Sequence, residues 1–207
     1  MRKKRALVAA LLSVSLFGTP ARAGDMTMSM PSMKTMPTPA PMPGMSIYNL
    51  SSQWTTQDGA ATALASLRGN LVVAAMVYTH CKDVCPLTTE RMQQIERALP
   101  KSSEGRVRFV LFSMDWMRDL PDRLRVFAAE HHIDRQHWTL FHGDEAAVRE
   151  LAAAFGISFQ RESNGDFQHS IAIFLLDRDG VVVAEEPDLS KPPQALTAKI
   201  RRLLGKR

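Results

Sequence analysis

The chain has 207 residues, of which 45% are hydrophobic and 23% charged, a composition that excludes wholesale disorder and a coiled-coil rod. The length suits one domain with short additions. A formal net charge of +5, from 26 basic and 21 acidic residues, raises the question of a nucleic-acid partner. Two further counts stand out, two cysteines and twelve methionines.

The first 23 residues predict a secretory signal peptide. The basic start MRKKR is followed by a mostly apolar run over residues 6–18 and by Ala21-Arg22-Ala23, which has the small-x-small form of a cleavage site. The apolar run is shorter than the roughly 20 residues of a spanning helix, so cleavage is favoured over an N-terminal anchor. Pro20 and Arg22 also interrupt any extension of the run.

The basic excess lies wholly within this signal peptide. Removing residues 1–23 takes away five basic residues and no acid, which leaves 21 of each and a net charge of zero. The case for a nucleic-acid partner therefore disappears. We expect an exported, periplasmic protein without stable membrane insertion after cleavage.

Residues 24–45 predict a disordered arm that is rich in Met and Pro. Repeated prolines deny helix hydrogen bonds, and the segment lacks a core-forming periodicity. The arm is either a plain linker or a site of copper capture, because thioether sulfur is a soft ligand that suits Cu(I). Seven of the twelve methionines lie here: Met26, Met28, Met30, Met33, Met36, Met42 and Met45.

The remaining residues, 46–207, alternate predicted strands with predicted helices. Apolar runs and turn signals predict strands at Leu71–Tyr78, Val107–Phe112, Trp138–Phe141, Ile171–Leu176 and Val181–Ala184. Apolar spacing and capping residues predict helices at Pro86–Leu99, at Pro121–His131, from Asp144 to Gly156, and over residues 192–204. This order predicts an α/β fold with a central sheet flanked by helices on both faces.

Both cysteines follow the first of these strands, in the segment THCKDVCP. Cys81 and Cys85 are expected in a loop that leads into a helix, with Pro86 opening the helix. The carboxyl ends of strands are where open α/β sheets bind ligands, and a helix N-terminus favours the thiolate form. The predicted site therefore lies at this end of the sheet.

Several chemistries are open to such a pair of thiols. A disulfide closing so short a loop would stabilise the fold by only about 2 kcal/mol, so a purely structural staple is disfavoured. Thioredoxin-type redox motifs have two intervening residues, whereas this chain has three. A structural zinc site normally needs four protein ligands. Copper accepts two thiolates and one imidazole, which directs the search to a histidine.

Of the six histidines, His169 is the candidate for that third ligand by position. It follows a polar loop, Glu162–Gln168, and shortly precedes a core strand. His80 adjoins Cys81, but in an extended segment adjacent side chains point in opposite directions. The other four are expected at helix ends and strand flanks: His131, His132, His137 and His142.

Together these residues resemble the Sco/SenC family, thioredoxin-fold copper proteins involved in cytochrome c oxidase assembly. The resemblance is carried by THCKDVCP, by Asp115 after Ser113-Met114, and by Gln168-His169-Ser170 before an apolar strand and a DRDG turn. It covers roughly residues 46–205. Two positions depart from the family, since Lys82 and Trp116 stand where proline is usual.

The resemblance implies a thioredoxin-like copper-binding domain with Cys81, Cys85 and His169 as ligands of one Cu(I) or Cu(II). It further implies a metallochaperone that passes copper to an oxidase subunit, such as a CuA site, or to another copper chaperone. Lys82 adds charge beside the thiols, which bears on their redox behaviour. Asp115 either helps to shape the site or is a simple turn residue.

Two alternative functions remain open at this point. A thiol–disulfide reductase would keep the copper-ligand cysteines of a partner reduced, and would need only Cys81 and Cys85. A copper-tolerance binding protein would rely on the Met-rich arm more than on the domain.

Overall fold

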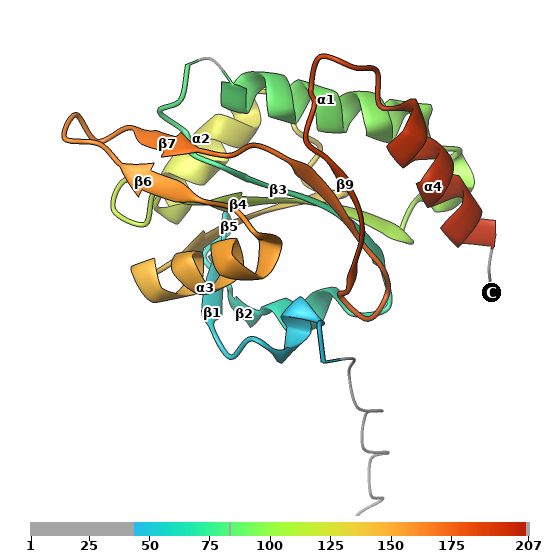
Figure 1. Cartoon of the computed structure of the whole chain (residues 1–207), viewed down its shortest axis with the longest axis horizontal. Helices are drawn as coiled ribbons and strands as arrows, with labels where there is room; N and C mark the ends of the chain where they lie inside the picture. The colour runs from blue at the N-terminus through green and yellow to red at the C-terminus, as the bar shows by residue number, and fades with distance from the viewer. Residues whose placement is uncertain (1–43, 83, 206–207) are drawn as a thin grey trace, which may run out of the picture. The chain divides into compact units, whose positions relative to one another are not determined.

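A mixed seven-stranded sheet lies at the centre of the fold, in the strand order β2-β1-β5-β4-β3-β8-β9 (Figure 1). The computed structural model describes residues 44–82 and 84–205. The expected signal peptide and nearly all of the Met-rich arm lie outside these residues. The strands are β1 (Gln53–Thr56), β2 (Ala61–Ala63), β3 (Leu71–Val77), β4 (Val107–Ser113), β5 (Trp138–Gly143), β8 (Ile173–Leu176) and β9 (Val182–Glu186).

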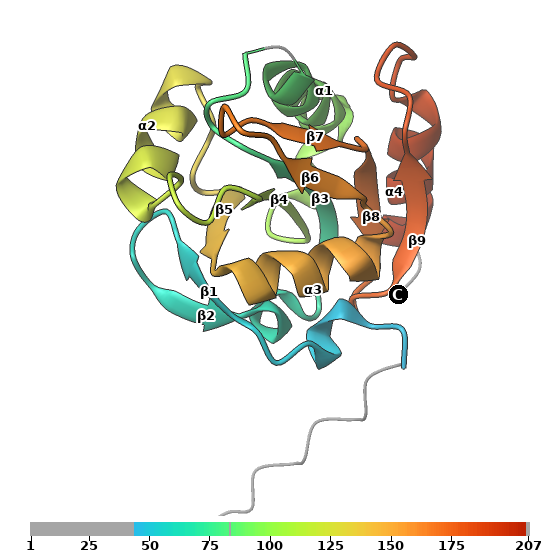
Figure 2. The same cartoon turned by 60° about the vertical axis from the view of Figure 1, so that its left-hand side comes forward.

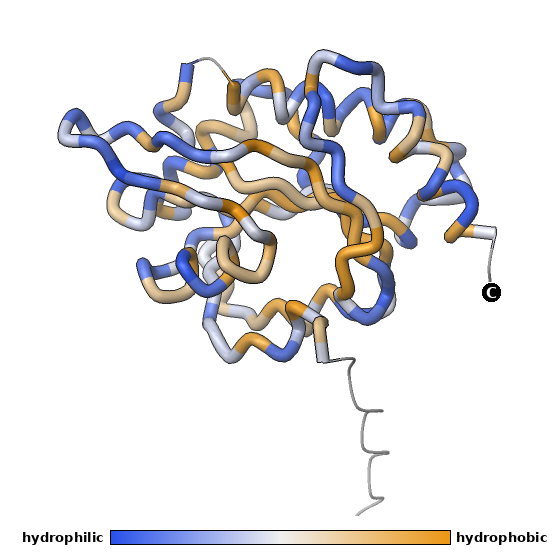
Figure 3. The backbone as a smooth tube through the Cα atoms, viewed as in Figure 1, coloured by the Kyte–Doolittle hydropathy of each residue, from blue (hydrophilic) through white to orange (hydrophobic). Residues whose placement is uncertain are grey.

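The three central strands are parallel and lie in the core. β3 pairs with β4, and β4 pairs with β5, while β8 runs antiparallel to β3. Every residue of β3 is buried, which explains why its sequence is an unbroken apolar run instead of an alternating one. Figure 3 shows the hydrophobic residues concentrated along these central strands.

Four helices pack on the two faces of the sheet, as predicted. Helices α1, α2 and α4 cover one face and α3 covers the other (Figures 1 and 2). The predicted caps of α3 are present, since the Asp144 side chain accepts the Ala147 N–H and Gly156 adopts the left-handed conformation at φ 68°. The helices are α1 (Val84–Ala98), α2 (Pro121–Glu130), α3 (Glu145–Phe155) and α4 (Gln194–Gly205), with short 3₁₀ helices at Ile47–Asn49, Leu64–Leu67 and Lys101–Ser103.

The start of α1 differs from the prediction. The helix begins at Val84, so Cys85 lies in its first turn and Pro86 is its third residue. The prediction that both cysteines lie in a loop was wrong for Cys85. Proline is tolerated in a first turn because the N–H groups there have no partner within the helix.

Two hairpins were missed by the sequence interpretation. β1 and β2 form one, at the edge of the main sheet. The other pairs β6 (Phe159–Arg161) with β7 (Phe167–His169) as a separate two-stranded sheet, where a polar loop was expected. Its strands are short and its turn is hydrophilic, as Figure 3 shows, so no apolar run marked them.

The helices of the described residues were also compared with the requirements of a membrane span. Between residues 44 and 205, apart from residue 83, none of the helices combines the length and apolar character needed to cross a bilayer.

Candidate functional site

The site is built on the adjacent carboxyl ends of β3 and β4. Val77 and Ser113 are paired at the ends of these strands, and the Met114 N–H donates to the Val77 carbonyl at 2.8 Å. Two loops therefore leave the sheet side by side. The first carries the cysteine motif, and the second, residues 114–120, leads to α2. Parallel strands bring their following loops to one edge, which is why residues about 35 positions apart meet here.

The two cysteines are held in different environments. The two are not joined by a disulfide, and Cys81 is partly exposed whereas Cys85 is only 1% exposed. The backbone N–H of Cys85 points at the Cys81 sulfur at 3.4 Å, and the N–H of Tyr78 points at the Cys85 sulfur at 3.5 Å. An N–H group at a helix N-terminus stabilises negative charge on the sulfur that it faces. The motif therefore presents one accessible sulfur and holds the other beneath it.

The buried thiol keeps its proton in this arrangement. The pKa of the Cys85 thiol is raised, first by its hydrogen bond with Cys81 and then by burial. A thiol hydrogen bond between the two sulfurs requires them to be close neighbours. The pair can therefore bind a soft metal or form a disulfide only when the Cys85 proton leaves.

Tyr78 connects the cysteine loop with the β6–β7 hairpin. Its ring lies 5.2 Å from that of Phe167 and 6.0 Å from that of His169, measured between centroids. Burial raises the pKa of Tyr78 to about 12, and the neighbouring Cys81 adds to the rise. Because Phe167 and His169 are two positions apart in one strand, they present the same face of β7 to this ring.

His169 is the last residue of β7. Its Nδ1 lies 2.9 Å from the Ser170 carbonyl oxygen. A carbonyl can only accept a hydrogen bond, so Nδ1 carries the proton and Nε2 offers its lone pair to a ligand. His169 lines a surface depression with Ser158, Phe159, Gln160, Gln168 and Ser170, whereas Cys81 lines a separate pocket.

The pocket at Cys81 is lined by three basic side chains, His80, Lys82 and Arg118. His80 and Cys81 line it together, because residues 79–80 form a turn and not an extended segment. The expectation of an extended segment at His80 was therefore wrong. Lys82, exposed beside the thiol, lies in the same pocket, and the full lining is Tyr78, His80, Cys81, Lys82, Arg118 and Asp166.

Sequence reasoning missed a buried carboxylate that binds Thr79, in the turn before Cys81. Asp119 is fully buried and accepts three hydrogen bonds, from the Thr79 N–H at 2.8 Å, the Thr79 hydroxyl at 2.5 Å and the Ser113 hydroxyl at 2.6 Å. Arg123 donates to the Thr79 hydroxyl as well, at 3.0 Å. The network joins the ends of β3 and β4 and fixes the backbone two residues before Cys81.

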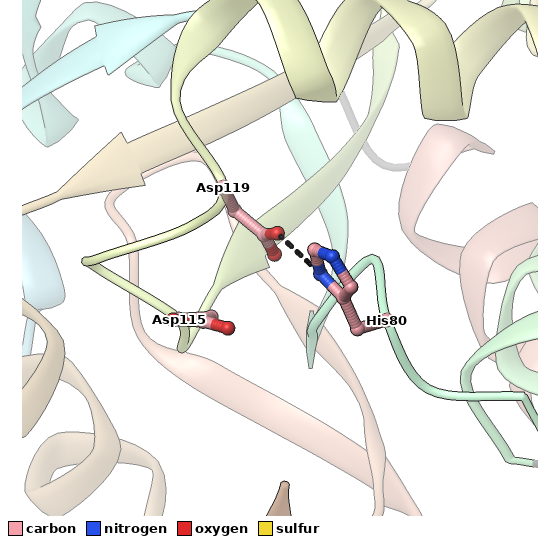
Figure 4. A group of neighbouring side chains, drawn as sticks. All are labelled: His80, Asp115 and Asp119. Atoms are coloured by element: carbon pink, nitrogen blue, oxygen red, sulfur yellow. Dashed lines mark ion pairs between the residues drawn. The ribbon is translucent and has the colours of Figure 1, made fainter. Parts of the chain in front are cut away.

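Asp119, Asp115 and His80 also form the cluster drawn in Figure 4. One potential ligand atom of each lies within 4.8 Å of the others, and the His80 Nδ1 lies 3.8 Å from an Asp119 oxygen. Both carboxylates already accept several hydrogen bonds, so the cluster is organised as an internal network. Within the described residues, the groups of this kind do not include Cys81, Cys85 or His169.

Asp115 is fully buried and does more than make a turn. Its carboxylate accepts the Arg118 backbone N–H at 3.2 Å and forms an ion pair with the Arg118 guanidinium. Trp116, the next residue, packs its ring against Phe159 and Phe167 of the hairpin. The loop after β4 therefore contacts the hairpin that carries His169. Of the seven methionines of the arm, Met45 alone lies within the described residues, and its side chain is 85% exposed.

These features define a thioredoxin-like protein with a CxxxC pair at the helix that follows a central parallel strand. The family model described as SCO1/SenC matches residues 45–205, and the chain belongs to that family.

Individual relatives agree with this assignment. The SCO1 protein homolog of Bacillus subtilis is 28% identical over 66% of this chain and 72% of its own. The structure of Bradyrhizobium japonicum ScoI with copper bound is 28% identical, with a TM-score of 0.63 over 73% of this chain and 96% of that chain. A SCO1/SenC family lipoprotein from Bacillus anthracis is 26% identical, with a TM-score of 0.69 over 76% of this chain and 96% of that chain.

Proposed function

We propose that this protein is a copper chaperone that binds one copper ion through Cys81, Cys85 and His169 and passes it to a copper-accepting oxidase subunit. The observation that carries the proposal is the pair of thiols, not joined by a disulfide, with Cys81 just before α1 and Cys85 in its first turn, and with an imidazole on the neighbouring hairpin. Two thiolates and one imidazole are a donor set that copper accepts in either oxidation state. The copper-bound ScoI relative and the name of the Sco family as cytochrome c oxidase assembly proteins support both the metal and the partner.

The arrangement of the thiols suggests an order of binding. Cys81 is the accessible sulfur, so copper meets it first. Binding of Cys85 then displaces the proton that its neighbour and its burial hold in place. His169 completes the site through Nε2, with Nδ1 anchored on the Ser170 carbonyl. Because His169 and Cys81 line separate depressions, His169 moves toward the thiols when copper binds, and this step also lets a partner exchange ligands.

A copper titration of the reduced protein tests this assignment. Cu(I) is added without oxygen in the presence of a chromogenic competitor, to the wild type and to Cys81→Ser, Cys85→Ser and His169→Ala. We expect one tightly bound ion in the wild type, loss of tight binding in both serine variants, and a weaker affinity in His169→Ala. A His169→Ala affinity equal to that of the wild type would remove His169 from the site.

A second function, thiol–disulfide reduction, is favoured by the difference in burial between the two cysteines. The Cys81 thiolate attacks one sulfur of a partner disulfide and releases the other as a thiolate, which takes up a proton. The Cys85 thiol then loses its proton and attacks Cys81, which leaves a Cys81–Cys85 disulfide and a partner with two thiols. Reduction of a disulfide peptide by the wild type and by His169→Ala at equal rates, without copper, would support this function.

The N-terminal segments enter the proposal as expectations from sequence. Residues 1–23 direct export to the periplasm, and the methionines of residues 26–45 collect Cu(I) for the domain. Deleting residues 26–45 should lower the number of weakly bound Cu(I) ions and leave the single tight site intact. Unchanged total stoichiometry would make the arm a plain linker.

A further inference from the structure

Arg118 joins the cysteine end of the sheet to the hairpin that carries His169. It lies in the loop between β4 and α2, and its guanidinium forms an ion pair with Asp115. The same guanidinium donates a hydrogen bond to the backbone carbonyl of Gly165, in the turn of the β6–β7 hairpin. One side chain thus bridges two segments that are 47 residues apart in the chain.

The two ends of this bridge are held differently. Asp115 is fully buried, and it also accepts the Arg118 backbone N–H, so the guanidinium is fixed firmly on that side. Toward the hairpin, the guanidinium donates to a backbone carbonyl in a hydrophilic turn. At Gly165, where φ is 87°, an added Cβ would lie 3.0 Å from the Arg118 guanidinium, so the turn is packed directly against it.

The hairpin turn and His169 belong to one short ladder. Arg161 pairs with Phe167, and Phe159 pairs with His169 at the other end. A paired hairpin of this length moves largely as a unit, so the place of its turn influences the place of His169. Asp166, next to Gly165, lines the pocket of Cys81, which brings this turn close to the thiol.

We propose that Arg118 is a positioning residue of the copper site, which holds the β6–β7 hairpin to Asp115 and thereby keeps His169 within reach of the cysteines. The inference rests on the proposed function, because it assumes that His169 is a ligand. Arg118 itself binds no copper. The ring contacts of Phe167 with Tyr78 and Trp116 keep the hairpin attached when the bridge is lost, so its removal loosens the ligand without unfolding the domain.

The test measures dissociation of Cu(I) from the loaded protein into an excess of a chromogenic chelator. Arg118→Gln should release Cu(I) about tenfold faster than the wild type, the size of effect typical for residues that orient a metal ligand. Arg118→Lys should also release faster, because a single ammonium group cannot bridge both partners in the way of a planar fork. Arg161→Gln is the control, since it removes one positive charge from an exposed position of the same hairpin.

The Cu(I) release rates of the Arg118 and His169 variants separate the two roles. In the His169→Ala background, Arg118→Gln should cause no further acceleration, and an undiminished effect there would overturn the proposal. Wild-type release from Arg118→Gln, with fast release from His169→Ala, would contradict the Arg118 role alone. Unchanged release from His169→Ala would contradict the ligand assignment itself. If Arg118→Gln does not fold, Arg118→Lys, which keeps the charge but not the fork, gives the same test, and wild-type release from it would contradict the role of Arg118.

Discussion

The carboxylate of Asp119 accepts hydrogen bonds from both the backbone N–H and the hydroxyl of Thr79, at 2.8 and 2.5 Å. This relationship fixes the turn from which Cys81 projects, because Thr79 is two residues before the first cysteine. The Ser113 hydroxyl, from the neighbouring strand, binds the same carboxylate. The geometry of the thiols therefore depends on a buried charge that is 38 residues away from Cys81 in the sequence.

Replacing Asp119 should destabilise the domain strongly. In Asp119→Asn one carboxylate oxygen becomes an NH₂ group. This group faces N–H or O–H donors and cannot accept their hydrogen bonds, so buried hydrogen bonds are lost. We expect a fall in the free energy of unfolding of about 3 kcal/mol, measured by urea denaturation. Asp122→Asn is the matched control, because that side chain is 87% exposed and its ion pair with Arg125 contributes little. Equal effects in the two variants would contradict the role of Asp119 as an anchor.

The two thiols should differ in their rate of alkylation. Under native, reducing conditions iodoacetamide should modify Cys81 at least about tenfold faster than Cys85, because Cys85 reacts only when α1 opens locally. Peptide mass spectrometry after timed quenching separates the two sites. Modification of Cys85 should become as fast as that of Cys81 in denaturant, and equal rates in the native state would argue against the burial of Cys85.

Cys85 should also shape the alkaline limb of the stability curve of the metal-free protein. Its pKa is raised in the folded state above the usual 9.0, so its contribution to stability is complete below pH 9. Above pH 9 the unfolded chain loses the proton while the folded protein keeps it, and stability falls. This one group should contribute a slope of about 1.4 kcal/mol per pH unit.

The comparison that isolates this contribution uses Cys85→Ser, whose hydroxyl does not titrate in this range. Urea unfolding of the reduced protein from pH 8 to pH 10.5 should give a shallower fall in the variant than in the wild type. The two buried tyrosines with raised pKa values, Tyr48 and Tyr78, are common to both proteins. Parallel curves would show that Cys85 titrates equally in the folded and unfolded states.

The ring of Tyr78 should matter more for the hairpin than its hydroxyl group. Tyr78→Phe keeps the ring on which Phe167 and His169 pack and loses the hydroxyl that bonds the Phe167 backbone, so it should cost about 1 kcal/mol. Tyr78→Ala should cost about 3 kcal/mol or more, as other large-to-small changes at buried aromatic positions do. Hydrogen exchange at residues 159–169 should accelerate more in Tyr78→Ala than in Tyr78→Phe, which loses only the hydrogen bond between the Tyr78 hydroxyl and the Phe167 backbone. Equal exchange in both variants would show that the ring does not hold the hairpin.

The sequence predicted those helices and strands whose own residues carry a local signal, such as an apolar run or a capping residue. The apolar run of β3 and the capping residues of α3 reflect local requirements, burial on both faces and the satisfaction of free N–H and C=O groups. The short hairpins were missed because three residues bury too little to impose a pattern. The start of α1 was predicted two residues too late, at Pro86, because proline fits several positions of a first turn.

For the site, sequence by itself determined the candidate residues, and their role as copper ligands remains our proposal. Cys81 and Cys85 are four positions apart in the chain, and their spacing next to a strand and a helix was visible without coordinates. Tertiary structure alone decided what surrounds them: Asp119 beneath Thr79, Tyr78 against His169, and Arg118 across to Gly165. These contacts join residues from separate loops that meet only because parallel strands deliver their carboxyl ends to one edge of the sheet.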